Sequence, residues 1–153
     1  MFIIRDYEPK DYDQVMRLHV EAMEFAGVYK GDGPWEDDLK DIVNTYRKNN
    51  GVFLVGELDG KIIAMGAFKK SGDLLAEVKR MRVSPNLQGK GYGQMILECL
   101  EERARKMGYA GFHLETSEAQ TAAHGLYGRN GFSEAGRTVI DGYKCILFEK
   151  RFV

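Results

Sequence analysis

The chain has 153 residues, a length that fits one domain spanning residues 1–153 around one core. With 44% apolar and 29% charged residues, the composition excludes a disordered or a fibrous chain. The 22 basic and 23 acidic residues leave a net charge of -1, so overall charge provides no case for binding nucleic acid or an anionic membrane. The first ten residues become charged before a signal-peptide core could form, which predicts a cytoplasmic protein.

The first third of the chain is predicted to form one strand and two helices. A short apolar strand covers Phe2–Arg5, and Asp11 followed by Gln14 resembles a capping box at a helix start. The first helix is indicated by side chains at helical spacing, Val15, Leu18, His19 and Ala22. After a glycine-containing loop over residues 24–34, a second helix is indicated by Trp35, Leu39, Ile42, Val43 and Tyr46.

The middle of the chain predicts three consecutive antiparallel strands. The segments Val52–Leu58 and Lys61–Phe68 flank Asp59-Gly60, a dipeptide that favours a type I′ hairpin because both residues accept a positive φ. A second turn leads into the strand Leu74–Val83.

The rest of the chain alternates helices and strands. A glycine-rich loop over residues 87–93 leads into a helix over 92–107, and a strand at Gly111–Thr116 precedes a helix at Ala119–Arg129. A closing hairpin joins Thr138–Ile140 to Tyr143–Phe148. This order predicts an α/β fold of the α+β type with a mixed sheet, in which Leu74–Val83 runs parallel to Gly111–Thr116.

The cysteines and histidines carry no catalytic or metal-binding pattern. Cys99 and Cys145 lie in apolar segments and are interpreted as reduced packing residues. His19, His113 and His124 have no partner at ligand spacing, so no metal is expected. A nucleophile elbow of the Gly-x-Ser-x-Gly type is also missing, which excludes that hydrolase class.

The glycine-rich loop is the most informative segment. It runs from the end of a strand through Gln88-x-x-Gly91-x-Gly93 into the start of a helix. Such a loop presents free N–H groups and the positive end of a helix dipole, and missing Cβ atoms let a pyrophosphate come close. Its spacing fits neither a dinucleotide fingerprint nor a P-loop.

This loop pattern resembles that of the GNAT superfamily of acyl-CoA-dependent N-acetyltransferases. Residues 76–83 resemble the central strand of that family, with Glu77 eleven positions before Gln88, where many members place a carboxylate. Residues 123–132 resemble the A-x-x-L-Y-x-x-x-G-F segment of the family, and the likeness covers about residues 50–150. One departure is Gln120, where many relatives carry asparagine against the cofactor.

The resemblance implies a mixed, mostly antiparallel sheet flanked by about four helices, with acetyl-CoA (coenzyme A) as cosubstrate. It implies a central strand that separates from its parallel neighbour after a bulge, leaving main-chain groups for the pantetheine arm, and a backbone N–H near Met81 would suit the carbonyl oxygen of the thioester. The cofactor-binding residues that it implies are Met81, Arg82, Val83, Gln88, Gly89, Lys90, Gly91, Tyr92, Gly93, Gln120 and Arg129. Four basic residues against one acidic residue between 76 and 93 fit an anionic cofactor, although Arg129 could instead complete the dipole of its helix.

The catalytic candidates are Glu77 as general base and Tyr127 as general acid. An amine with a pKa of ~10.4 must lose a proton before it attacks, and a departing thiolate accepts a proton or hydrogen bond. The alternative for Glu77 is a solvated residue paired with Lys61 or Lys79, and the alternative for Tyr127 is a core residue.

The functional prediction is an N-acetyltransferase that acts on a primary amine, either a small molecule or a protein amino group. A non-catalytic acyl-CoA-binding module is the alternative, and a ligand-free interaction domain ranks last because it leaves the glycine loop unexplained. An acceptor pocket could be formed by Phe25, Tyr29, Trp35, Glu36, Asp37 and Asp38. Trp35 could equally anchor its helix, while the acids favour the helix dipole. The identity of the amine, and the choice between monomer and homodimer, stay open.

Overall fold

The computed structural model describes residues 1–153 as one seven-stranded sheet with four α-helices. The strands are β1 (Phe2–Asp6), β2 (Val52–Leu58), β3 (Lys61–Lys70), β4 (Leu75–Val83), β5 (Gly111–Ser117), β6 (Ser133–Ile140) and β7 (Tyr143–Arg151). The α-helices are α1 (Tyr12–Phe25), α2 (Ile42–Thr45), α3 (Tyr92–Lys106) and α4 (Thr121–Arg129). Short 3-10 helices are η1 (Pro9–Asp11), η2 (Pro34–Asp41), η3 (Arg47–Asn49) and η4 (Pro85–Leu87).

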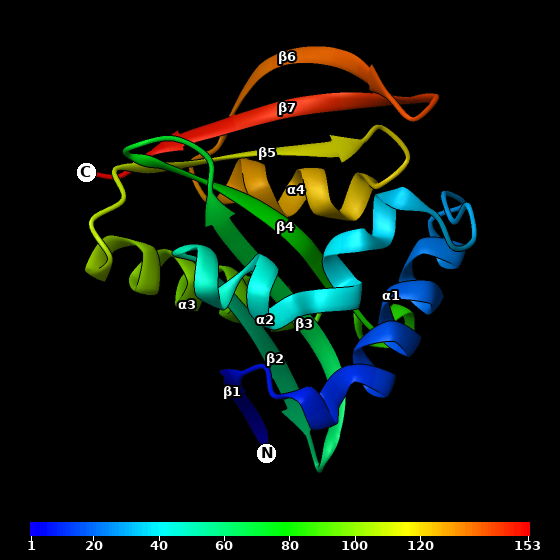
Figure 1. Ribbon diagram of the computed structural model, residues 1–153. Coiled ribbons are helices and arrows are strands. Elements are labelled where there is room, and N and C mark those ends of the chain that lie inside the picture. Colours follow the sequence, from blue (N-terminus) through cyan, green and yellow to red (C-terminus); the bar gives the residue numbers. More distant parts are fainter.

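The sheet has the order β1-β2-β3-β4-β5-β7-β6 and is mixed, as predicted (Figure 1). β4 and β5 form its parallel pair, and every other neighbouring pair is antiparallel. The predicted turn at Asp59-Gly60 has a positive φ at both central residues, 52° and 85°, and the Asp141-Gly142 turn of the closing hairpin has 51° and 83°. β6 begins at Ser133, five residues earlier than expected.

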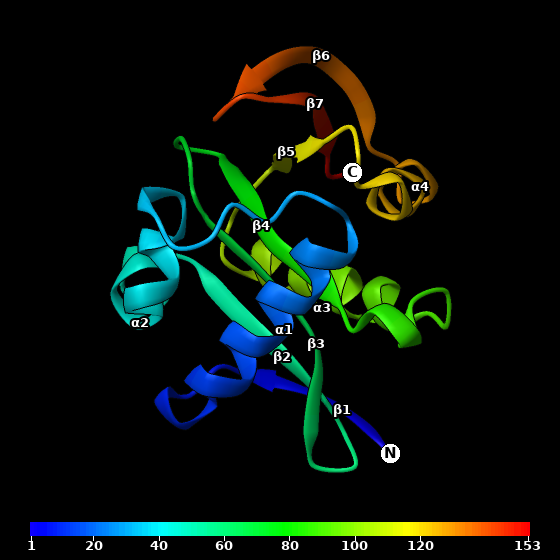
Figure 2. The same cartoon turned by 90° about the vertical axis from the view of Figure 1, so that its right-hand side faces the viewer.

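Helices cover both faces of the sheet, and each face has its own core. Figure 2 shows α1 and α2 on one side of β2–β4, and α3 on the other. A cluster of 18 buried residues lies on the side of α3 and α4, and one of 11 lies on the side of α1 and η2. No helix is both long and apolar enough to cross a membrane.

The predicted capping box at Asp11 and Gln14 is wrong. The Asp11 carboxylate instead accepts two hydrogen bonds from Arg5, at 2.7 and 2.8 Å, and one from the Glu8 N–H at 2.8 Å. Gln14 Oε1 accepts a hydrogen bond from the Ile62 N–H at 3.0 Å. A buried carboxylate gains more from a guanidinium than from a neutral helix N–H, and Arg5 accordingly lowers the pKa of Asp11.

The second predicted helix is not continuous. The segment from Trp35 to Tyr46 forms the 3-10 helix η2 followed by the short helix α2. The break lies at Asp41, which leaves helical geometry and whose carboxylate accepts a hydrogen bond from the Asn44 side chain at 2.8 Å. Of the five residues on the predicted face, Leu39, Ile42 and Tyr46 lie in the core, whereas Val43 is half-buried and Trp35 is exposed.

A bulge in β4 creates the opening that the site occupies. Arg80 and Met81 together lie opposite Gly66 of β3, and Arg80 adopts the left-handed φ of 60°. On its other edge β4 pairs with β5 only as far as Glu77, which lies opposite His113. Beyond Glu77 the two strands separate, as the family resemblance implied.

Candidate active site

Two cavities meet where β4 and β5 separate. The larger has a volume of about 650 Å³ and the smaller a volume of about 230 Å³. Four residues line both of them: Met81, Arg82, Gln120 and Ala123. Their junction therefore lies beside the β4 bulge and the start of α4.

The larger cavity is built around the glycine-rich loop. Gly89 and Gly91 have positive φ values of 78° and 92°, and Gly91 is the N-cap of α3. The Met95 N–H donates to the Gly91 carbonyl at 3.1 Å, so the N–H groups of the preceding first turn have no acceptor within the helix. A loop of this geometry suits an anionic group, and the cavity volume lies within the usual range for ligand sites.

Most of the predicted cofactor residues line this larger cavity. They are Met81, Arg82, Val83, Gln88, Gly89, Gly91, Tyr92, Gly93, Gln120 and Arg129. Lys90 is exposed and is not among the residues that line either cavity. Arg129 forms no ion pair, and its guanidinium lies near Gly125, one turn earlier on α4.

The junction between the cavities is partly occupied by hydrogen-bonded side chains. Thr116 Oγ1 donates to Gln120 Oε1 at 2.8 Å, and Gln120 Nε2 lies 3.5 Å from the sulfur of Met23. The Gln120 amide, longer than the asparagine of many relatives, is thus held by α1 and β5 at the place where the two cavities meet.

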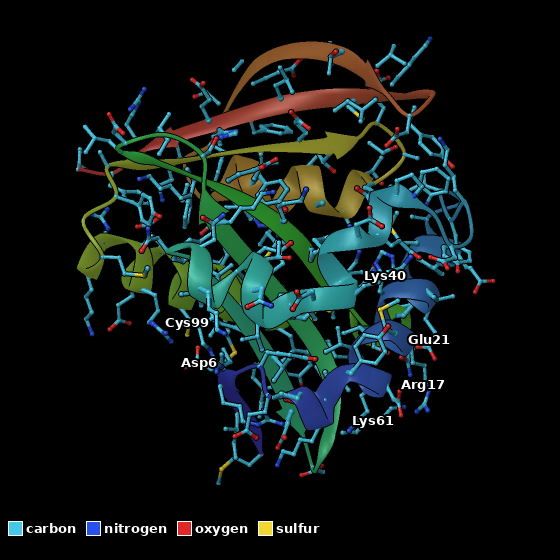
Figure 3. The ribbon with its side chains drawn as sticks, in the orientation of Figure 1. Asp6, Arg17, Glu21, Lys40, Lys61 and Cys99 are labelled. Carbon is cyan, nitrogen blue, oxygen red and sulfur yellow. The ribbon has the colours of Figure 1, made fainter.

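The structure brings both catalytic candidates into the smaller cavity. Glu77 and Tyr127 line it together. Glu77 forms neither an ion pair nor a side-chain hydrogen bond, so the expected alternative of a pair with Lys61 or Lys79 does not occur. Lys61 begins β3, whereas Glu77 lies opposite Lys69 near its other end (Figure 3).

Tyr127 contributes to the core and also faces the cavity. Its side chain is 4% exposed, and its ring lies 5.3 Å from Phe132 and 5.9 Å from Phe148, measured between centroids. The hydroxyl has no hydrogen-bond partner within the protein, and burial raises the pKa of Tyr127. The phenol therefore keeps its proton at neutral pH and has that proton available for a ligand.

A buried His19–Glu36 pair also lines the smaller cavity, and the sequence did not predict it. His19 is 1% exposed and Glu36 2%, and His19 Nε2 lies 2.5 Å from Glu36 Oε2. Burial and the nearby arginines lower the pKa of His19 to about 3, while burial raises the pKa of Glu36. His19 Nδ1 is buried without a partner.

The other residues of the predicted acceptor pocket divide between several roles. Tyr29 and Trp35 line the smaller cavity with Glu36, whereas Phe25 lines the larger one. Asp37 is exposed. Asp38 lines neither cavity, and its carboxylate binds Arg80.

Arg80 ties η2 to the bulge. Its guanidinium donates to both carboxylate oxygens of Asp38, at 3.0 and 2.6 Å, and to the Trp35 carbonyl at 2.6 Å. Tyr46 also donates to Asp38, at 2.6 Å. Arg80 holds the pKa of Asp38 down to about 2 against the effect of burial. These hydrogen bonds hold Trp35 and its neighbour Glu36 beside β4.

Comparison with known proteins agrees with this geometry. The model of the acetyltransferase (GNAT) family matches residues 12–132. An IAA acetyltransferase from Azospirillum brasilense is 33% identical over 119 residues, which cover 76% of this chain and 78% of that protein. An N-acetylaspartate synthetase from Xenopus tropicalis is 32% identical over 120 residues, which cover 75% of this chain but only 44% of the synthetase.

Solved structures show the same fold at lower identity. An acetyltransferase of the GNAT family from Staphylococcus aureus superposes with a TM-score of 0.90 at 17% identity, covering 99% of both chains. The PaiA N-acetyltransferase from Thermoplasma acidophilum, solved in complex with coenzyme A, superposes with a TM-score of 0.82 at 20% identity and covers 99% of both chains. The family match over most of the chain, the bulged β4 and the glycine loop together establish that this protein belongs to the acetyltransferase (GNAT) family.

Proposed function

We propose that this protein transfers an acetyl group from acetyl-CoA to a primary amine, which attacks the thioester directly. The observation that carries the proposal is the meeting of two cavities at Met81 and Arg82. One cavity has the lining of an anion site, and the other holds an unpaired carboxylate and a protonated phenol.

The larger cavity fits coenzyme A. Gly89 and Gly91 both have a positive φ. A Cβ at either position would meet no other protein atom, so the space beside the loop is open to a ligand. The N–H groups at the start of α3 can then bind phosphate oxygens. Met81 in the bulge has no register partner on β3 and lines the larger cavity, which supports contact between this part of β4 and the pantetheine arm. When bound, the cosubstrate supplies an acetyl group activated as a thioester.

Glu77 is proposed to accept the proton of the amine. At pH 7 only about one in 2,500 molecules of an amine with a pKa of ~10.4 is neutral and able to attack. Glu77 forms no internal ion pair, so its carboxylate is free to receive this proton directly or through one water molecule.

Tyr127 is proposed to donate its hydroxyl hydrogen to the leaving sulfur. Its raised pKa keeps the phenol protonated, and its hydroxyl has no competing acceptor within the protein. The thiolate that leaves has a pKa of ~8.5, so a hydrogen bond or a proton from Tyr127 stabilises it as the carbon–sulfur bond breaks.

The test is release of the free thiol from acetyl-CoA across a panel of amines, with calorimetry of coenzyme A binding on the same preparation. We expect binding and amine-dependent release together. Binding without release for every amine would favour the acyl-CoA-binding module, and absence of binding would refute both.

We further propose that residues 1–153 act as one catalytic domain in the cytoplasm. The single sheet, which joins β1 near one end of the chain to β7 near the other, supports the first part. Proteolysis of the purified chain, which should leave one resistant core, and cell fractionation check the two parts separately.

A further inference from the structure

Arg82 is a half-buried cation that forms no ion pair. Its Nη1 donates to the carbonyl of the adjacent Met81 at 2.9 Å, and its Nε is buried without any hydrogen-bond partner. The neighbouring Arg80, by contrast, is bound on both carboxylate oxygens of Asp38. Arg5, which is also partly buried, forms ion pairs with Asp11 and Glu57.

Arg82 lines the smaller cavity together with Glu77, Tyr127 and the His19–Glu36 pair. It also lines the larger cavity, because it belongs to the junction of the two. Arg82 therefore lies beside the place where an acceptor amine would meet the acetyl group.

Arg82 forms no ion pair, and two carboxylates on η2 are bound by other residues. Arg80 and Tyr46 bind Asp38. Glu36 is bound to His19. Burial and Arg80 lower the pKa of Arg82 to about 10, which still leaves it charged at neutral pH.

A guanidinium without a counterion is costly to bury even in part, and a ligand that supplies an anion lowers that cost. Nη1 binds Met81 and Nε is enclosed by the protein, so Nη2 is the nitrogen that has no partner and is not enclosed. A carboxylate can accept a charge-assisted hydrogen bond from this nitrogen.

We propose that Arg82 binds a carboxylate of the acceptor, which makes the acceptor a small amino acid. This inference rests on the proposed function and assigns Arg82 to the acceptor rather than to the cofactor. The smaller cavity, about 230 Å³ in volume, suits a small molecule. Glu77 in the same cavity supplies the opposite charge, so that the two residues together complement a molecule carrying an ammonium and a carboxylate.

The experiment uses acceptors that differ only in the carboxylate. Thiol release from acetyl-CoA is measured with each amino acid, with its carboxamide and with the corresponding amine that lacks the carboxyl group. The wild-type protein should prefer the amino acid. In Arg82→Gln, kcat/KM should fall by about 10-fold or more for the amino acid and by less than about threefold for the carboxamide, since the charge-assisted contact is lost only with the former.

Two further variants separate charge from geometry. Arg82→Lys keeps the charge but not the planar guanidinium, so it should retain only part of the preference. Arg17→Gln removes a cation from the exposed face of α1 (Figure 3) and should leave all three acceptor series unchanged. Circular dichroism and denaturant unfolding of Arg82→Gln check that the fold is retained.

An equal loss for all three acceptor types would overturn the inference and place Arg82 at the reacting carbonyl oxygen. A wild-type preference for carboxylate-free amines or for peptide N-termini would also overturn it, while leaving the proposed acetyl transfer intact. If no acceptor reacts, the proposed function fails. Calorimetry with N-acetyl amino acids and their amides then decides the carboxylate contact alone, because Arg82→Gln should abolish binding of the former if the contact exists.

Discussion

His19 Nε2 on α1 lies 2.5 Å from Glu36 Oε2 on η2, and both side chains are almost completely buried in the wall of the smaller cavity. The pair joins two elements that are separated by a loop and by seventeen positions in the chain. A neutral imidazole can donate its Nε2 hydrogen to the carboxylate, and the lowered pKa of His19 favours that neutral form.

This pair predicts a loss of stability in acid. The pKa of His19 is about 3 in the folded protein and ~6.5 when unfolded, so the unfolded state binds the extra proton first as pH falls. The free energy of unfolding should therefore decline below pH ~6.5, by up to about 1.4 kcal/mol per pH unit for this proton. Urea denaturation between pH 4.5 and 8 measures it. His19→Asn should flatten this dependence, and an unchanged slope would contradict the assignment.

Tyr127→Phe should retain coenzyme A affinity and lose turnover. The substitution removes one hydroxyl and preserves the ring contacts with Phe132 and Phe148, so the fold should be unaffected. General acid assistance is typically worth about 10²–10⁴-fold in rate. Steady-state kinetics with one fixed acceptor measures the loss, and Tyr12→Phe, on the exposed part of α1, is the control. Full activity in Tyr127→Phe would make Tyr127 a packing residue only.

Glu77→Gln should lose activity mainly at pH values below the pKa of the acceptor amine. As pH rises toward that pKa, solvent supplies the neutral amine and the need for a base diminishes. Rates across pH 6 to 10 should therefore converge with those of the wild type at the alkaline end. The matched control is Glu21→Gln, which changes a carboxylate on the outer side of α1 (Figure 3). A constant ratio of rates at all pH values would exclude Glu77 as the base.

Gly91→Ala should destabilise the protein, and Gly128→Ala should not. The φ of Gly91 is 92°, a conformation that costs an L-residue about 1–2 kcal/mol even though its Cβ would meet open space. Gly128 lies within α4 without positive φ and without atoms near its Cβ position, so alanine there should add about 0.5–1 kcal/mol of stability. Denaturant unfolding of both variants tests this contrast, and equal shifts in the two would contradict it.

Gly93→Ala should be tolerated by the fold, in contrast to Gly91→Ala. Gly93 has helical geometry, and its Cβ would make ordinary contacts at 3.5 Å with Leu126 and Val83. Gly93 also lines the larger cavity, so a larger side chain there should interfere with coenzyme A rather than with folding. Gly93→Val should weaken coenzyme A binding in calorimetry without loss of folding, and unchanged affinity would place the phosphates elsewhere.

Local sequence patterns were sufficient for much of this protein. The two Asp-Gly turns, the glycine loop and the parallel pair of β4 and β5 follow from residue spacing and from the special φ values that glycine and aspartate accept. Glu77, Gln88 and Tyr127 could be named as site residues because they belong to short motifs whose spacing is itself the signal.

Tertiary contacts decided which charged side chains are free for chemistry. Whether Arg80 or Arg82 lacks a partner depends on Asp38, which lies more than forty positions away and reaches only Arg80. The pairing of His19 with Glu36 likewise depends on how η2 lies against α1. Ion pairs form between groups that folding brings within a few ångströms, and no periodicity in the chain records that distance. The sequence by itself therefore determined the fold and the cofactor loop, whereas burial and long-range pairing decided the acceptor side.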